Sequence, residues 1–430
     1  MLAKASPELF RSPLRRLRPI PRPLFLASFP PRECGIATFT DDIKTAIENR
    51  TGEAADVIAV DDGKAYAYPA SVIGTIERDD AGSYAAAAEL INAHPSEVLN
   101  VQHEYGLFGG DRGEMLVELL ARIVKPIVTT LHTVLPAPDL VLRRVTREIC
   151  NRSDAVVVLA QRGKDLLEGD YGIDPRKVRV VLHGAPDVPL RSSRHFKRRL
   201  GLGGKTVLST FGLLSPGKGI EYLLDALPAI FERHPRAVYQ LLGETHPQIR
   251  RREGEAYRES LMARAERLGI ADRVSFENHY MTGDEIIEHL LATDVYVSPS
   301  LDPNQIVSGT LSYAVACGRV VVATASAYAR ELLADGRGMA VAFRSAAALE
   351  LAINAVLADP RRRAAMETVA YRFGRRLIWP RVAREYEAAF RDAARVGRFK
   401  FRSRVGVPGA GLIESSLRAV RGSSLVNAAD

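Results

Sequence analysis

The sequence predicts two α/β domains, each a doubly wound, Rossmann-like parallel sheet covered by helices. Short apolar runs alternate with amphipathic stretches along most of the chain, which is typical of strands alternating with helices. This alternation occurs in two series, separated by a polar and basic stretch at residues 187–204. The length of 430 residues also suits more than one domain, at about 150 residues each. Strand–helix alternation favours parallel sheets buried on both faces.

The first series predicts a domain over residues 23–186. Its expected strands are the apolar runs at 24–29, 56–60, 98–102, 126–131, 154–159 and 178–182. Its expected helices have apolar residues at helical spacing and lie at 39–50, 83–94, 113–124 and 139–151.

The second series predicts a domain over residues 205–377. Strands are expected at 206–211, 237–242, 273–276, 294–298, 319–323 and 339–342. Helices are expected at 219–234, 254–268, 283–292, 306–317 and 345–357, followed by a last helix at 378–396. Residues 187–204 are the expected interdomain linker, because they are polar and end in glycines.

The formal net charge of +8 sits at the two ends of the chain. Residues 1–22 hold six Lys or Arg and one Glu, and residues 396–430 hold six Lys or Arg and two acids. The body between them is therefore close to neutral, which argues against nucleic acid as a partner. Residues 1–22 are rich in proline and residues 397–430 in Gly, Ser and Arg, so both read either as disordered basic tails or as segments that contact an anionic membrane surface.

The composition excludes several classes of protein. Charged residues make up 26% and hydrophobic residues 47%, which are ordinary values for a globular chain. No run approaches the roughly 18 apolar residues of a membrane-spanning helix. Cys34, Cys150 and Cys317 have neither metal-ligand nor disulfide-framework spacing, so a cytoplasmic protein is expected. If the basic ends contact a membrane, the protein is expected at its inner face.

Four loops of the first domain carry residues suited to ligand binding, because sites in doubly wound sheets lie at the carboxyl ends of strands. Gly35 lies between a strand and a helix, where backbone amides can meet an anion. His103 and Glu104 follow the third strand, His132 follows the fourth, and His183 lies at the exit of the domain. Each also has a structural interpretation: a plain turn, a hydrogen-bonded pair, a buried histidine or a capping histidine.

Two loops of the second domain suit a phosphate. Gly217 and Lys218 follow its first strand and place a flexible lysine at a helix start, although the spacing is not that of an ATPase phosphate loop. The second loop, 298–310, leads into a helix whose first turn would present backbone amides to a diphosphate. The residues at that helix start are Ser308, Gly309 and Thr310.

Taken together, these motifs resemble the retaining family-4 glycosyltransferases of GT-B fold. The features shared with the family are His-Gly at the domain exit, Gly-Lys-Gly after the second domain's first strand and a helix ending Ala-Cys-Gly. A narrower bacterial subgroup is indicated by five further runs: Cys34–Thr40, Gln102–Gly106, Thr130–Leu135, Gly243–Pro247 and Ser308–Ala314. The resemblance covers about residues 24–390 and omits both ends.

The resemblance implies a nucleotide-diphosphate sugar donor held mainly by the second domain and a glycan or lipid-linked acceptor held mainly by the first. It implies a hexosyl transfer in glycan or polysaccharide synthesis, with retention at the anomeric carbon, no cofactor and no obligatory metal. Lys218 matches the lysine on the donor diphosphate, His132 the histidine near the donor sugar, and Gly35 the glycine loop near the diphosphate and acceptor. His103, Glu104 and His183 are candidate acceptor or sugar contacts.

The sequence departs from the family in two places. An arginine that usually precedes the lysine is missing in Gly212-Leu213-Leu214, and Arg250, Arg251 or Arg252 could replace it. The family's two glutamates, eight positions apart, are missing as well. Counting back from Gly318 puts Gln305 and Tyr313 at their positions, and a shift of one residue puts Asn304 and Ser312 there. Asn304 and Gln305 can bond a sugar hydroxyl but carry no charge.

Two alternatives to a glycosyltransferase remain. One is a catalytically weak protein that binds a nucleotide sugar or scaffolds a polysaccharide assembly complex. The other is a different enzyme on the same fold, such as a sugar-nucleotide epimerase or a phosphorylase. The sequence does not determine the donor sugar, the base, the acceptor or the linkage.

Overall fold

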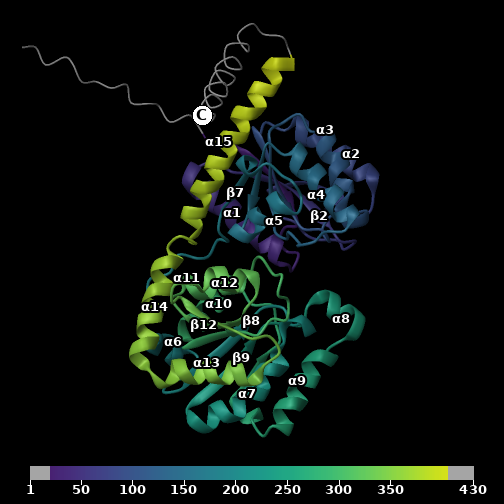
Figure 1. The fold of residues 1–430 in the computed structure, drawn as a ribbon. Helices are drawn as coiled ribbons and strands as arrows, with labels where there is room; N and C mark the ends of the chain where they lie inside the picture. The colour runs from purple at the N-terminus through teal and green to yellow at the C-terminus, as the bar shows by residue number, and fades with distance from the viewer. Residues whose placement is uncertain (1–19, 405–430) are drawn as a thin grey trace, which may run out of the picture.

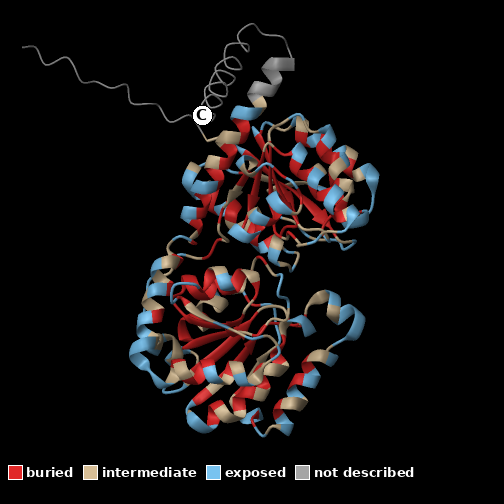
Figure 2. Cartoon of the chain, viewed as in Figure 1, coloured by how far each residue is buried: buried red, intermediate tan, exposed pale blue. Residues whose placement is uncertain are grey.

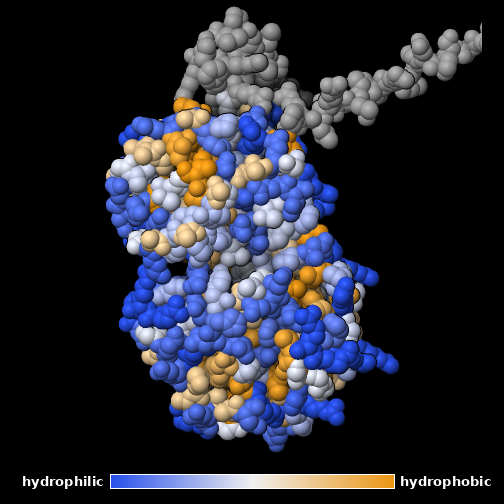
Figure 3. Space-filling view, turned by 180° about the vertical axis from the view of Figure 1, so that it is seen from behind, coloured by the Kyte–Doolittle hydropathy of each residue, from blue (hydrophilic) through white to orange (hydrophobic). Residues whose placement is uncertain are grey.

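The computed structural model describes the backbone of residues 20–404 and the side chains of residues 20–397. Most of the predicted basic tails, residues 1–19 and 405–430, lie outside this range. The chain forms two α/β domains, one above the other in Figure 1, with a waist between them in the space-filling view of Figure 3. No helix among the described residues has the length and apolar character needed to cross a bilayer.

The first domain is built on a seven-stranded parallel sheet of order β3-β2-β1-β4-β5-β6-β7. Its strands are β1 (Pro23–Ala27), β2 (Asp56–Asp61), β3 (Val72–Glu77), β4 (Val98–His103), β5 (Ile127–Leu131), β6 (Ala155–Val158) and β7 (Val178–Val180). Its helices are α1 (Gly35–Thr51), α2 (Ala81–Ala93), α3 (Met115–Arg122), α4 (Leu140–Arg152) and α5 (Gln161–Gly169). The strand order reverses direction at β1, so the switch point lies between β1 and β4.

The second domain repeats this plan on a six-stranded parallel sheet of order β10-β9-β8-β11-β12-β13. Its strands are β8 (Thr206–Phe211), β9 (Ala237–Leu242), β10 (Val274–Glu277), β11 (Val295–Ser298), β12 (Val320–Thr324) and β13 (Gly338–Val341). Its helices are α7 (Ile220–Arg233), α8 (Pro247–Glu253), α9 (Ala256–Arg267), α10 (Gly283–Ala292), α11 (Gly309–Ala316), α12 (Ala327–Leu332), α13 (Ala346–Ala358) and α14 (Pro360–Gly374).

The strands of both sheets form the buried centre of each domain, and the helices turn their exposed sides outward (Figure 2). The central strands β1, β4 and β5 are buried over their whole length because helices cover both faces. All five residues of β1, for example, are buried. The predicted fold class of two doubly wound domains is therefore confirmed.

The sequence analysis missed several elements. β3 at the sheet edge was not predicted, because only Ile76 of its six residues is buried and it lacks a long apolar run. The helices α5, α8, α12 and α14 were not predicted either. Gly35 was placed in a loop but begins α1, where the Cys34 sulfur accepts the backbone N–H of Ala37 at 3.4 Å.

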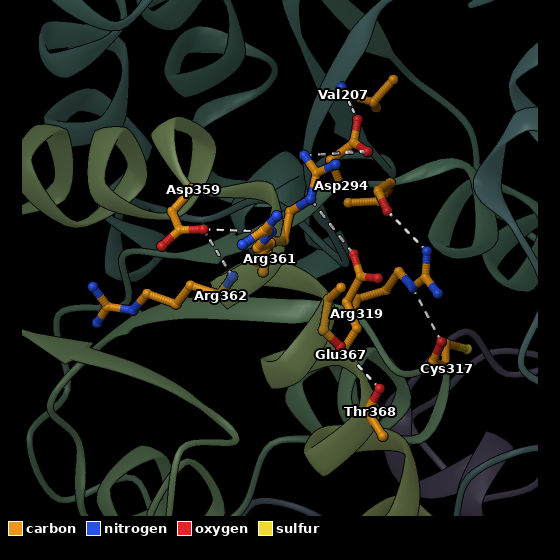
Figure 4. A network of polar contacts seen from close by, with 12 residues as sticks. Val207, Asp294, Cys317, Arg319, Asp359, Arg361, Arg362, Glu367 and Thr368 are labelled. Atoms are coloured by element: carbon orange, nitrogen blue, oxygen red, sulfur yellow. Dashed lines mark hydrogen bonds and ion pairs between the residues drawn. The ribbon is translucent and has the colours of Figure 1, made fainter.

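The predicted linker, residues 187–204, contains a helix, α6 (Ser193–Arg199), which packs against α10. Lys197 of α6 forms an ion pair with the buried Asp294, which also accepts the backbone N–H of Val207 at 2.7 Å. Figure 4 shows how Asp294 continues into a network with α14, where Arg363 lies 3.8 Å from both Asp294 and Glu367. This segment therefore belongs to the second domain.

The last helix crosses back to the first domain. α15 (Trp379–Arg404) begins beside Ala185, whose backbone pairs with Ile378, and runs along α1. Trp379, Tyr386 and Phe390 pack into the same apolar cluster as Phe39 of α1. The prediction that this helix ends at residue 396 was wrong, because the helical backbone continues to Arg404 into the segment expected to be a flexible tail.

Candidate active site

The loops after β8 and β11 meet at Gly212. A Cβ atom at Gly212 would lie 3.4 Å from Thr310 Cγ2 and 3.6 Å from Lys218 Nζ, and its φ of +121° favours glycine. A backbone hydrogen bond of 2.9 Å from Leu301 N–H to the Gly217 carbonyl joins the two loops. Lys218 and the start of α11 therefore face one small space at the carboxyl edge of the second sheet.

The Lys218 ammonium has no ion pair or hydrogen bond within the described part of the chain. Burial lowers its pKa below the ordinary lysine value, so its charge is poorly solvated. Burial lowers the pKa of the His246 imidazole, and the charge of the nearby Lys218 lowers it further. A cation without a counter-charge beside helix amides is an arrangement suited to an anion.

The N-terminus of α11 is ordered by its own side chains and by the first domain. Ser308 is the N-cap and accepts the backbone N–H of Leu311 at 3.4 Å, and its hydroxyl lies 3.1 Å from that of Thr310. A Cβ at Gly309 would lie 3.0 Å from His183 Nε2, so only glycine fits there comfortably. His183 Nδ1 bonds the Gly184 carbonyl at 2.7 Å, and burial lowers the pKa of His183 to about 4.

None of the four candidate positions for the family's two glutamates supplies a carboxylate. Asn304 is exposed, and its backbone N–H donates to the Asp302 carboxylate at 2.9 Å. Gln305 is half-buried, and its carbonyl accepts the backbone N–H of Tyr328 at 2.9 Å. The Ser312 hydroxyl is buried against the hydroxyl of Tyr328, and the Tyr313 hydroxyl donates across the domains to Asp42 at 2.9 Å.

In the first domain, His132 is 4% exposed and bonds Gln102 Oε1 through Nε2 at 2.9 Å. Its ring packs edge-on against Phe39, with centroids 4.8 Å apart. Burial, together with the nearby His183 and His103, lowers the pKa of His132 to about 3. His132 is therefore neutral at physiological pH.

His103 and Glu104 end β4 but are placed differently. His103 is fully buried between aromatic rings, burial lowers its pKa to about 3, and neither ring nitrogen has a hydrogen-bond partner among the described residues. Glu104 accepts the Thr133 hydroxyl at 2.6 Å and the Tyr105 N–H at 2.9 Å. The Glu104 carboxyl therefore joins the loops after β4 and β5. Burial raises its pKa, which makes the ionised form less favourable than in water.

Gly35 opens onto empty space, because a Cβ there would meet nothing within 4 Å. The nearby face of α1 contacts the second domain, and Thr38 bonds the Tyr280 hydroxyl at 3.1 Å. Gly35 thus lies in the first turn of the helix that faces both domains.

The arginines considered as replacements for the missing family arginine already have partners. Arg250 pairs with Glu244 at 2.9 Å, Arg251 with Asp62 of the first domain at 3.4 Å, and Arg252 with Glu253 at 3.5 Å. Lys218 differs from these three arginines, because it has no ion pair among the described residues. No group of three or more His, Cys, Asp or Glu side chains among the described residues is arranged to hold a metal ion.

Comparisons with known proteins agree with this architecture. Residues 192–373 match the family model described as glycosyl transferases group 1, and residues 50–187 match the model described as Glycosyltransferase Family 4. The chain belongs to glycosyltransferase family 4. The resemblance seen in the motifs is therefore confirmed. The first model covers every strand of the second sheet, and the second model covers every strand of the first sheet except β1.

Two relatives indicate where this glycosyltransferase stands in the family. It is 33% identical over 238 residues to the GDP-mannose-dependent alpha-(1-6)-phosphatidylinositol monomannoside mannosyltransferase of Mycolicibacterium smegmatis, covering 53% of this chain and 59% of that one. It is 26% identical over 310 residues to the D-inositol 3-phosphate glycosyltransferase of Corynebacterium glutamicum, covering 68% and 72%. The match thus spans little more than half of the mannosyltransferase.

Solved structures show the same fold. HepE of Anabaena, crystallised with UDP and glucose, superposes with a TM-score of 0.67 at 19% identity, over 85% of this chain and 98% of its own. The sucrose-phosphate synthase of Thermosynechococcus elongatus superposes with a TM-score of 0.70 at 18% identity, over 86% and 98%. At these identities the likeness concerns the GT-B fold alone.

Sequence reasoning missed three residues that the structure brings to the site. His246 was quoted within a motif but given no role, although its loop follows β9, the neighbour of β8. Asn100 was placed inside a strand and Gln102 at its end and in a quoted motif, and neither was given a role, although both are buried amides hydrogen-bonded in series to His132. Two amides in an otherwise apolar central strand were the available signal, because buried amides need specific partners.

Proposed function

We propose that this glycosyltransferase moves a sugar from a nucleotide-diphosphate sugar to an acceptor hydroxyl. One observation carries the proposal: the partly buried Lys218 ammonium has no counter-charge among residues 20–397 and lies beside the N-terminus of α11. A diphosphate supplies the missing negative charge, and the helix amides supply hydrogen-bond donors to it. Gly212 leaves room for the close approach of the diphosphate.

Lys218 and the α11 amides act on the leaving group. When the bond between the anomeric carbon and the diphosphate breaks, negative charge grows on the phosphate oxygens, and fixed positive groups stabilise it. We propose that these groups suffice without a metal ion or other cofactor. The acceptor hydroxyl then attacks from the face that the diphosphate leaves and gives its proton to the departing phosphate oxygen, so the configuration at the anomeric carbon is retained.

The first domain would hold the acceptor and one side of the donor sugar. His132 is neutral and hydrogen-bonded in place, so it serves as a fixed polar contact to a sugar hydroxyl. Glu104, Thr133 and the space before Gly35 lie at the carboxyl ends of neighbouring strands and are the proposed acceptor contacts. The relatives act on phosphatidylinositol monomannoside and on D-inositol 3-phosphate, so we propose an acceptor that carries inositol. An acceptor with a lipid would bring the protein to a membrane surface.

Turnover with a donor panel tests the proposal. The purified protein is incubated with UDP-, GDP- and ADP-sugars and with inositol-containing and glycan acceptors, with and without EDTA. We expect transfer from one donor, unchanged by EDTA, and a product whose anomeric configuration by NMR equals that of the donor. Absence of both transfer and nucleotide binding would refute it.

A second candidate is a nucleotide-sugar-binding protein with little or no turnover. The positions of the family glutamates favour it, because Ser312 and Tyr313 use their hydroxyls in bonds to Tyr328 and Asp42. None of the four side chains at these positions, Asn304, Gln305, Ser312 and Tyr313, carries the negative charge that would stabilise positive charge on the transferred sugar. Nucleotide binding by calorimetry without detectable sugar transfer would favour this candidate.

A further inference from the structure

The inference concerns a chain of buried amides beneath His132. Asn100 and Gln102 are both fully buried in β4, two residues apart on one face of the strand. Asn100 Nδ2 donates to the Val128 carbonyl at 3.1 Å, Gln102 Nε2 donates to Asn100 Oδ1 at 2.7 Å, and His132 Nε2 lies 2.9 Å from Gln102 Oε1.

The donors and acceptors in this series of hydrogen bonds can be assigned in only one way. The carbonyl of Val128 can only accept, so the Asn100 amide must present its nitrogen there and its oxygen to Gln102. Gln102 must then donate through its nitrogen, which leaves its oxygen facing His132. That oxygen can only accept, so the proton of the neutral imidazole sits on Nε2.

This assignment leaves His132 Nδ1 as an acceptor. No hydrogen bond to Nδ1 occurs among the described residues. Nδ1 is not fully enclosed by the protein either, so a ligand can reach it. We propose that Asn100 and Gln102 are positioning residues that hold His132 in its Nε2–H tautomer, so that Nδ1 accepts a hydrogen bond from a hydroxyl of the donor sugar. The role of the sugar in this inference rests on the proposed function.

Helix α15 also contacts this series of hydrogen-bonded side chains. The hydroxyl of Tyr386 in α15 is 2.9 Å from Thr130 Oγ1. Burial raises the pKa of Tyr386, and hydrogen-bonding contacts with Thr130 and Gln102 partly offset this rise. The helix that returns from the second domain therefore packs against the residues that orient His132.

Two substitutions separate orientation from bulk stability. Gln102→Met keeps the size of the side chain but frees both tautomers of His132. Gln102→Glu places a carboxylate against Nε2, which raises the pKa of His132 from about 3. The control is Thr129→Val, because the Thr129 hydroxyl is equally buried and bonds Ser153 at 2.7 Å outside this chain.

The first readout needs no activity. In ¹⁵N-histidine NMR, with His132→Gln for assignment, we expect wild-type Nε2 to have a protonated-nitrogen shift and Nδ1 an unprotonated one. Gln102→Met should average the two nitrogens, and Thr129→Val should leave them unchanged. A protonated Nδ1 in the wild type, or an unchanged pattern in Gln102→Met, would overturn the inference whether or not the protein turns over a donor.

The second readout is donor kinetics. Loss of a neutral hydrogen bond that orients one contact should lower kcat/KM for the donor by about threefold to tenfold in Gln102→Met. Gln102→Glu should lose activity as pH falls through the new His132 pKa, because a protonated Nδ1 cannot accept, whereas the wild type shows no such limb above pH 5. Equal losses in Thr129→Val, or identical pH profiles, would contradict the positioning role. A wild type that binds no donor would refute the proposed function and leave the tautomer test standing.

Discussion

Lys218→Met offers the sharpest test of the donor site, because it should weaken ligand binding while it stabilises the free protein. The ammonium has no described partner, and burial lowers its pKa, so at neutral pH the folded state pays to keep it charged. A lysine whose pKa is lowered by folding makes the protein gain stability only as pH rises through that pKa toward 10.4. Methionine has a similar stem and carries no such cost.

The magnitude on binding follows from the kind of bond lost. A hydrogen bond to a charged group contributes about 1.5–3 kcal/mol, so the affinity for a nucleoside diphosphate should fall about 10- to 150-fold. The same change should leave the unliganded melting temperature equal to or above that of the wild type at pH 7. Lys205→Met, at an exposed lysine that precedes β8, is the matched control and should change neither quantity.

Calorimetry of nucleoside diphosphate binding and a thermal melt of the free protein give both quantities. The reasoning would be refuted by an affinity within twofold of the wild type, because Lys218 would then not contact the phosphates. It would also be refuted by a large drop in the melting temperature of the free variant, which would show that the ammonium supports the fold through its own contacts.

Three further outcomes are expected. Asn304→Glu should raise turnover several-fold if the lost charge limits the reaction, and unchanged rates across the donor panel would favour the binding-protein candidate. Gly184→Ala should lower the free energy of unfolding in urea by about 1–3 kcal/mol or more, because a Cβ there would lie 2.1 Å from the Trp379 ring; a neutral effect would contradict the packing between the domain exit and α15. Tyr313→Phe should destabilise more at pH 8 than at pH 5, because burial raises the pKa of Asp42 to about 6 and the hydroxyl stabilises the ionised carboxylate more than the neutral carboxyl. Melting temperatures at both pH values check this, and a pH-independent difference would count against the contact between the domains.

The periodicity of the sequence was enough to predict the sheets, because parallel strands buried on both faces are largely apolar. The runs at β8 and β9 were predicted with the bounds that the structure has. β3 escaped because an edge strand with one buried residue leaves almost no apolar signal. α6 escaped because four of its seven residues are Lys or Arg and none of the seven is buried, so no apolar face marks it.

The candidate site was predictable only as a set of loops. The topology brings Lys218 and Thr310 together because their loops follow neighbouring strands, β8 and β11. Local residue spacing does not reveal the order of strands in a sheet. The structure was therefore needed to show that the loops after β8 and β11 meet at Gly212. The same holds for Tyr313, whose bond to Asp42 joins residues 271 positions apart.

A thermal-shift screen of the wild-type protein against UDP, GDP and ADP tests the central claim most directly. The claim is that the second domain binds a nucleotide diphosphate through Lys218 and the start of α11. Ligand at 100 times its dissociation constant stabilises by about 2.7 kcal/mol. We predict that one of the three raises the melting temperature by about 5–10 °C, since about 1 kcal/mol moves a domain of this size by about 2–4 °C. No shift with any of the three at millimolar concentration would contradict the claim.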